Sequence, residues 1–135
     1  MMSSLKRNSF PAFERIKSRR IFDALFLHGT ALKQYPIQMI WMEVPYNAAS
    51  PVKIAVSAPK RFMRNAVDRN RMKRMVRESY RINKHPLQQT LTAANKSLVL
   101  LFIVQSKTQL SFTETQEKII LLLQRLIPLH YVAAQ

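Results

Sequence analysis

The chain has 135 residues, of which 47% are hydrophobic, and 22 Lys and Arg against 7 Asp and Glu give a formal net charge of +15. That length suits a single domain with its own core, and the hydrophobic content excludes an intrinsically disordered chain. The absence of cysteine excludes disulfides, thiolate metal sites and a thiol nucleophile, and it fits the reducing cytoplasm, where we expect the protein. The charge favours a polyanionic partner, with nucleic acid ahead of an anionic membrane.

The N-terminal part of the chain contains one predicted helix. Residues 1–17 are polar and basic, have no apolar signal-sequence core, and are expected to form a loose tail. From Ser18 on, the sequence SRRIFDALFLHG places apolar residues at i, i+1, i+4 and i+5, which predicts a short amphipathic helix capped by Ser18. Gly29 is the single glycine of the chain, and we expect it to end this helix in the left-handed conformation.

Three segments have the patterns of strands. Residues 36–44 combine apolar, β-branched and aromatic side chains, and residues 52–59 alternate between apolar and polar positions until Pro59. Residues 97–106, SLVLLFIVQS, form a continuous apolar run, which predicts a central strand buried on both faces. A fourth candidate strand lies near 31–35.

The second half of the chain contains two longer predicted helices, over 66–81 and 111–127. In the latter, Ser111 and Glu114 have the spacing of a capping box. Pro86 argues against a helix through 85–96, where a loop or a short helical turn is expected, and 128–135 should form a second loose tail. Polar residues interrupt the apolar stretch 119–134, so no membrane span is expected. This order of elements predicts one α+β domain over 1–135, with helices packed on a small sheet.

The sequence AVDRNRMKRMVRESYR, residues 66–81, concentrates five arginines and one lysine against two acids. At about 100° per residue, one side of this helix is suited to the core, and it carries Met72, Met75, Val76 and Ser79, with Tyr80 at its edge. The opposite side carries Asn70, Lys73, Arg74, Arg77 and Arg81, with Arg69 and Arg71 flanking the row. The helix therefore presents a basic stripe away from the core.

This stripe has two interpretations, a solvated surface or a binding site. An ordinary solvated helix face intersperses acids at i, i+4, but here only Glu78 can pair, with Arg74 or Arg81. Arginine outnumbers lysine, which favours forked contacts to phosphates over solubility alone. The start of the helix, preceded by Asn65, adds backbone N–H donors for a phosphate. The pattern therefore favours binding to nucleic acid.

This stretch also resembles the signature of the bacterial ribonuclease P protein subunit, a family with an AV.RNR.KR..RE..R pattern on a central helix. The resemblance extends over roughly 17–127. Within it, IFDALFLHGT resembles the first helix of the family, KIAVSAPKR the strand that leads into a basic loop, and SFTETQEKIILLLQRL the final helix. Before AV, where many members have a glycine, this chain has FMRN and one extra residue. The resemblance therefore does not predict the path of the loop 60–65.

The resemblance implies a fold and a function. The fold is a small α+β sandwich of helices on a mixed sheet, with a left-handed βαβ crossover, similar to a ribosomal protein S5 domain. The function is that of the protein subunit, monomeric in its particle and not membrane-bound, of a ribonucleoprotein endonuclease. That enzyme, a hydrolase, removes the 5′ leader of precursor tRNA, and its RNA subunit performs the chemistry with Mg²⁺ held mainly by the RNA.

The resemblance also implies two sets of RNA-binding residues. The helix would bind the catalytic RNA through Arg69, Asn70, Arg71, Lys73, Arg74, Arg77 and Arg81. A cleft between the first helix and the sheet would bind the leader of precursor tRNA through Phe22, Phe26, Lys60 and Arg61. Considered without the resemblance, the two phenylalanines fit core packing better than base stacking, and Trp41 is also expected in the core.

The residues themselves indicate no active site in the protein. Cleavage of a phosphodiester by a protein-bound metal generally needs clustered carboxylates, but the seven acids and three histidines are scattered along the chain. No catalytic or metal-ligating residue is therefore assigned. The alternative function is a ribosomal protein or another RNA- or DNA-binding module, in which a basic helix could enter a DNA major groove. The Arg-Asn-Arg signature favours the ribonuclease P interpretation.

Overall fold

The computed structural model describes residues 14–130, which form four helices and four strands. In chain order they are α1 (Arg19–His28), β1 (Thr30–Gln34), β2 (Ile37–Val44), β3 (Val52–Ser57), α2 (Ala66–Asn83), α3 (His85–Ala94), β4 (Ser97–Val104) and α4 (Phe112–His130). The predicted α+β architecture is confirmed, and the candidate strand near 31–35 is β1.

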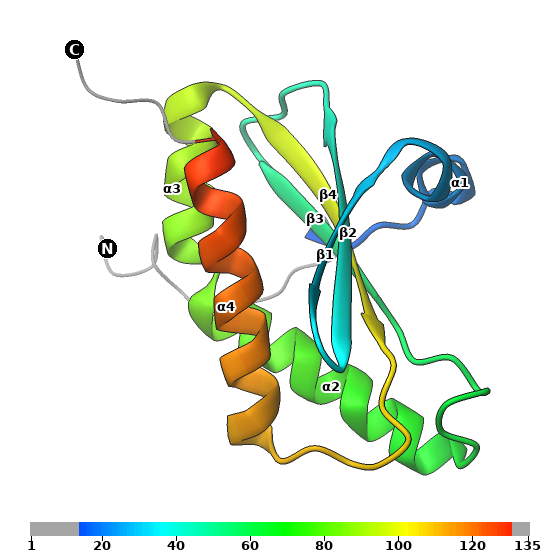
Figure 1. The fold of residues 1–135 in the computed structure, drawn as a ribbon. Helices are drawn as coiled ribbons and strands as arrows, with labels where there is room; N and C mark the ends of the chain where they lie inside the picture. Colours follow the sequence, from blue (N-terminus) through cyan, green and yellow to red (C-terminus); the bar gives the residue numbers. More distant parts are fainter. Residues whose placement is uncertain (1–13, 131–135) are drawn as a thin grey trace.

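The four strands form one mixed sheet in the order β1-β2-β4-β3 (Figure 1). Strand β2 pairs antiparallel with both β1 and β4, whereas β3 pairs parallel with β4. Strand β4 therefore has a neighbour on each side, and every one of its residues is buried. This confirms the central strand that the apolar run predicted.

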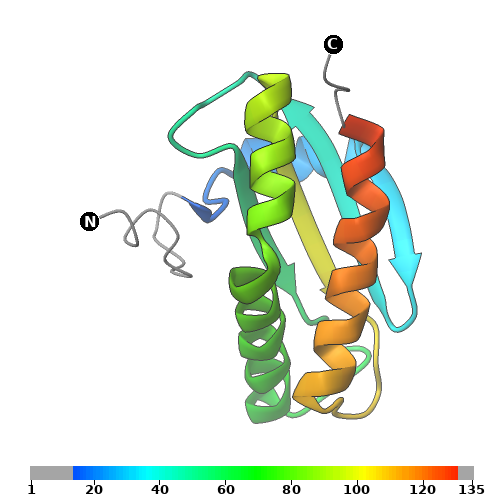
Figure 2. The ribbon, with the colours of Figure 1, turned by 90° about the vertical axis from the view of Figure 1, so that its left-hand side faces the viewer.

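Helices cover both faces of the sheet, with α2, α3 and α4 on one face and α1 on the other (Figures 1 and 2). On one side of β4, Leu98, Leu100 and Phe102 join the main core with the three helices. On its other side, Val99 and Leu101 join a smaller cluster with Leu25 of α1 and Ile16. Within residues 14–130, no helix, including the largely apolar α4, is long and apolar enough to cross a bilayer.

The connection from β3 to β4 has the rare left-handed sense. Both strands are parallel neighbours, and α2 and α3 connect them over one face of the sheet. In Figure 2 the helices lie toward the viewer, both strands point down, and β4 lies to the right of β3. Since the usual right-handed crossover would place β4 to the left, the left-handed crossover that the resemblance implied is confirmed.

Gly29 follows α1 for a reason other than the one expected. Its φ is −72°, so the prediction of a left-handed residue is wrong. A Cβ atom here would lie 2.4 Å from Cγ2 of Ile40 and 2.5 Å from the carbonyl oxygen of Leu25. Glycine is needed because the end of α1 lies directly against β2.

Three expectations about loops and tails are wrong in the described residues. Pro86 lies in the first turn of α3, where its missing N–H has no helical acceptor in any case, so 85–94 form a complete helix. Helix α4 continues through Pro128 and ends at His130, which is buried. At the other end, the N–H of Ile16 donates to the carbonyl of Ile54 at 2.9 Å, so 14–16 are not a loose tail. The rest of the two predicted tails, 1–13 and 131–135, lies outside the described residues.

Candidate nucleic-acid interface

Helix α2 begins with a side-chain cap at Asn65. The Oδ1 atom of Asn65 accepts a hydrogen bond from the N–H of Val67 at 2.9 Å, and the carboxylate of Asp68 lies in the first turn, where the helix dipole favours an anion. The inner side of the helix buries Met72, Val76, Ser79 and Tyr80. Tyr80 thus belongs to the core itself, whereas the expected core residue Met75 is only half-buried.

The basic side of α2 is less uniform than its helical wheel predicts. Asn70, Arg71 and Arg74 are exposed, and we call these three residues the outer stripe. The other predicted members are half-buried, namely Arg69, Lys73, Arg77 and Arg81. The three arginines of this set have surroundings within the protein that explain their partial burial.

Arg69 is directed back into the loop that precedes α2. Its Nη1 atom donates to the carbonyl oxygens of Met63 at 3.1 Å and Arg64 at 2.6 Å. From the other side, Nε2 of Gln109 donates to the carbonyl of Asp68 at 2.9 Å. These bonds fix the loop 60–65, whose path the sequence did not predict, against the start of the helix.

Arg81 is paired with an acid on its own helix. Its Nε donates to Oε1 of Glu78 at 3.0 Å, the i, i+3 option of the two partners considered for Glu78. The hydrogen bond from Arg81 lowers the pKa of Glu78 and raises that of Arg81. Since this arginine already has a carboxylate partner, less of its charge is available to RNA than in the outer stripe.

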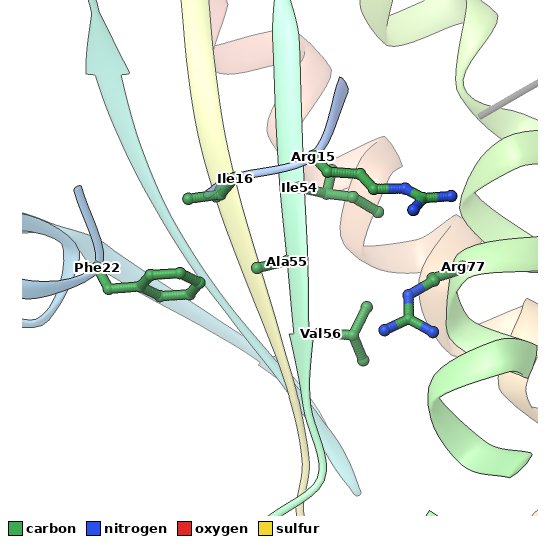
Figure 3. Close-up of a pocket in the computed structure, with 7 residues that line it drawn as sticks. All are labelled: Arg15, Ile16, Phe22, Ile54, Ala55, Val56 and Arg77. Carbon is green, nitrogen blue, oxygen red and sulfur yellow. The ribbon is translucent and has the colours of Figure 1, made fainter. Parts of the chain in front are cut away.

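A basic hollow of about 220 Å³ crosses the outer edge of β3. We call it the edge groove, and it is lined by Arg15, Ile16, Phe22, Ile54, Ala55, Val56 and Arg77. Figure 3 shows Phe22 of α1 on one side of the strands and the guanidinium groups of Arg15 and Arg77 on the other. Within the described residues, only a single bridge between Arg15 and Ile54 pairs with this edge of β3.

The two arginines of the edge groove come from distant parts of the chain. Arg77 lies on α2, whereas Arg15 precedes α1. Partial burial, and then the positive charge of Arg15, lower the pKa of Arg77 below its ordinary value. Two like charges brought together, with an aromatic ring on the other side of the edge strand, form a suitable site for a phosphate and a base of single-stranded nucleic acid.

The residues predicted for a leader cleft are only partly brought together. Phe22 lines the edge groove and also packs against the smaller core cluster. Phe26, one turn further on, does not line it and is 65% exposed, so it is not a core residue. Lys60 and Arg61 are exposed in the loop after β3 and do not line the hollow either. Arg15, which does, was missed because one apolar residue, Ile16, is too short a signal to predict a strand-like segment.

The titratable residues form no metal site in the described part of the chain. Within residues 14–130, no three His, Cys, Asp or Glu side chains gather where they could hold a metal ion. His130 packs edge-on against Trp41 with ring centroids 4.9 Å apart, and Trp41 itself packs against the main core. Burial, and then the charge of Lys96, lower the pKa of His130. These groups lie in the structural part of the molecule and not in the edge groove.

Comparison with known proteins gives a consistent result at the level of sequence. Residues 10–127 match the model of the family described as Ribonuclease P. The chain is 36% identical to a "Ribonuclease P protein component" of Porphyromonas gingivalis over 93 residues, which cover 69% of this chain and 68% of that protein. A second Porphyromonas gingivalis protein of the same description is 34% identical, and the match covers 71% of this chain and 74% of the relative.

Solved structures give the same result at the level of the fold. The chain resembles the RNase P protein from Thermotoga maritima with a TM-score of 0.64 at 25% identity, covering 83% of this chain and 96% of that one. It resembles the RNase P protein of Staphylococcus aureus with a TM-score of 0.65, covering 84% of this chain and 94% of that one. At 19% identity, the second likeness concerns the fold alone.

Proposed function

The chain belongs to the ribonuclease P protein family, and on that premise we propose that it is the protein subunit of a cytoplasmic ribonucleoprotein that removes the 5′ leader from precursor tRNA. In this particle the outer stripe binds the catalytic RNA and the edge groove binds the single-stranded leader. The RNA performs the cleavage, and the protein acts as one copy that increases affinity for substrates that carry a leader. The match of residues 10–127 to the Ribonuclease P family favours this function over the general alternative, a ribosomal or other nucleic-acid-binding module.

The single observation that carries this proposal is the edge groove. It combines a partly exposed aromatic ring with two guanidinium groups at the outer edge of β3, and aromatic rings and arginines are the side chains that bind bases and phosphates of single-stranded nucleic acid. The side chains of the outer stripe are exposed and do not line the groove. We therefore assign the outer stripe and the edge groove to two different RNA segments.

Mg²⁺ is assigned to the RNA partner in this proposal. Hard cations such as Mg²⁺ prefer several oxygen ligands, and the described residues supply no cluster of carboxylates for one. The protein residues accordingly bind and orient RNA, and no proton transfer or metal ligation is assigned to them.

The proposal is tested by two titrations of matched variants in the reconstituted particle. Arg77→Ala should weaken binding of precursor tRNA that carries a leader, whereas Arg74→Ala, three residues earlier, should weaken binding of the catalytic RNA. Phe22→Leu keeps an apolar side chain in the core cluster but removes the stacking surface, and it should reduce leader affinity roughly five- to a hundredfold. Phe26→Ala serves as the comparison outside the groove. Equal effects of Arg77→Ala and Arg74→Ala on both titrations would contradict the division into two surfaces.

A further inference from the structure

Glu14 and Lys84 form a buried ion pair beside the edge groove. The Nζ atom of Lys84 lies 2.8 and 3.1 Å from the two carboxylate oxygens of Glu14, and the two side chains are only 3% and 9% exposed for Lys84 and Glu14 respectively. Lys84 lies where α2 ends and α3 begins. The pair thus joins the segment before α1 to the helical layer, across 70 positions of sequence.

The segment 14–16 passes around the edge of the sheet from one face to the other. Glu14 faces the helical layer, where its carboxylate accepts hydrogen bonds from Lys84. Burial, and then the negative charge of Glu14, raise the pKa of Tyr80 of α2. Two residues after Glu14, Ile16 belongs to the cluster on the α1 face. Arg15 is held between these two anchors and lines the edge groove.

Arg15 and Arg77 line the same groove and carry like charges. Arg15 lies close enough to Arg77 for its charge to lower the pKa of that residue, and like charges repel most strongly where water is partly excluded. Among the described residues, the segment pairs with the sheet through one β-bridge, between Arg15 and Ile54. The Glu14–Lys84 pair attaches the same segment to the helical layer in addition to this bridge.

The ion pair is also poorly explained as a source of stability. Removing two charges from water costs about as much as their attraction returns, and buried pairs can often be replaced by apolar residues without loss. What such a pair can provide is a fixed position, because a buried charge tolerates only the arrangement that brings its partner within hydrogen-bond distance.

We propose that the Glu14–Lys84 pair is a positioning device that holds Arg15 beside Arg77, so that both guanidinium groups are in place for one phosphate of single-stranded RNA. The proposal rests on the proposed function of the edge groove. Glu14 and Lys84 do not themselves contact RNA. They place the Arg15 side chain before the phosphate arrives, which lowers the cost of ordering it on binding.

The test uses the particle reconstituted from the full chain and the catalytic RNA. The variant is Glu14→Ala combined with Lys84→Met, because removing both charges avoids the penalty of an unpaired buried ion. Affinity is measured for precursor tRNA with a leader and for mature tRNA, on the parent and on an Arg15→Ala background. If the pair acts through Arg15, the double change should reduce leader affinity about tenfold on the parent background and no further on the Arg15→Ala background. Mature tRNA should bind unchanged.

A second measurement follows the position of the segment directly. The N–H of Ile16 is bonded to Ile54 in the parent, so its hydrogen exchange should accelerate in the double variant while the amides of β4 remain protected. A folded variant with unchanged leader affinity, or with a reduction that adds to that of Arg15→Ala, would overturn the proposal. If the parent particle binds precursor and mature tRNA equally well, the proposed function of the groove is wrong instead. Hydrogen exchange of the Ile16 amide would still test the positioning role in that case. Unchanged exchange in the double variant would overturn this role, and faster exchange would support it.

Discussion

Replacement by alanine should have different effects at Arg69 and Arg71, which lie two residues apart on α2. The first change should lower stability, and the second should weaken RNA binding. The guanidinium of Arg69 donates to the carbonyls of Met63 and Arg64, whereas Arg71 is exposed. Hydrogen bonds from a charged donor contribute about 1.5–3 kcal/mol in folded proteins. Because these two bonds are partly exposed, Arg69→Ala should lower the free energy of unfolding by about 1.5–3 kcal/mol in total and the Tm by roughly 5–10 °C.

Arg71→Ala should instead leave the unfolding transition in place and alter only RNA binding. Each phosphate that the protein no longer neutralises should flatten the dependence of log affinity on log salt concentration by about 0.7–0.9. Chemical denaturation followed by circular dichroism gives the first quantity, and titration with the catalytic RNA over a range of salt gives the second. If Arg69→Ala unfolds at the same denaturant concentration as the parent, its two carbonyl bonds do not fix the loop, and Arg69 returns to the RNA-binding set.

Two further predictions concern titratable side chains. The pKa of His130 is lowered in the folded state, so the unfolded state binds the proton more tightly. The free energy of unfolding should therefore fall as pH decreases through about 6.5. His130→Gln should flatten this pH dependence of stability between about pH 7 and 5. The fluorescence of Trp41, the only tryptophan, should decrease in the same pH range as the adjacent ring gains a proton, and an unchanged signal would contradict this assignment. Glu78→Gln should release Arg81 and strengthen binding to the catalytic RNA at low salt. The free energy of unfolding should change by less than about 1 kcal/mol, because the ion pair is partly exposed. Weaker RNA binding by this variant would show that the paired arrangement itself binds RNA.

Local signals in the sequence predicted most of the fold correctly. The apolar run of β4 identified a strand buried on both faces, and Ser111 and Glu114 exchange the two hydrogen bonds of a capping box at 3.0 and 3.1 Å. The buried side of α2 also followed from its helical period, apart from Met75. These features depend on neighbours within one turn or one strand, which is why a single sequence contains them.

Features that depend on distant contacts were not accessible in the same way. Gly29 is required by its distance from Ile40 across the fold and not by its own φ. The segment at Arg15 is ordered by partners 39 and 70 positions later, at Ile54 and Lys84. The helical wheel likewise treated all basic residues of α2 as equivalent, because it contains neither the loop that Arg69 contacts nor the strand edge that Arg77 faces.

The most direct test of a protein subunit that binds the leader is a comparison of two substrates with and without the protein. The affinity of the catalytic RNA for precursor tRNA and for mature tRNA is measured alone and after addition of the chain, in Mg²⁺ at near-physiological salt. We expect the protein to strengthen binding of precursor tRNA and to leave mature tRNA nearly unchanged, and the protein alone should leave the precursor intact. Equal strengthening of both substrates, or site-specific removal of the leader by the protein alone, would contradict the proposed function.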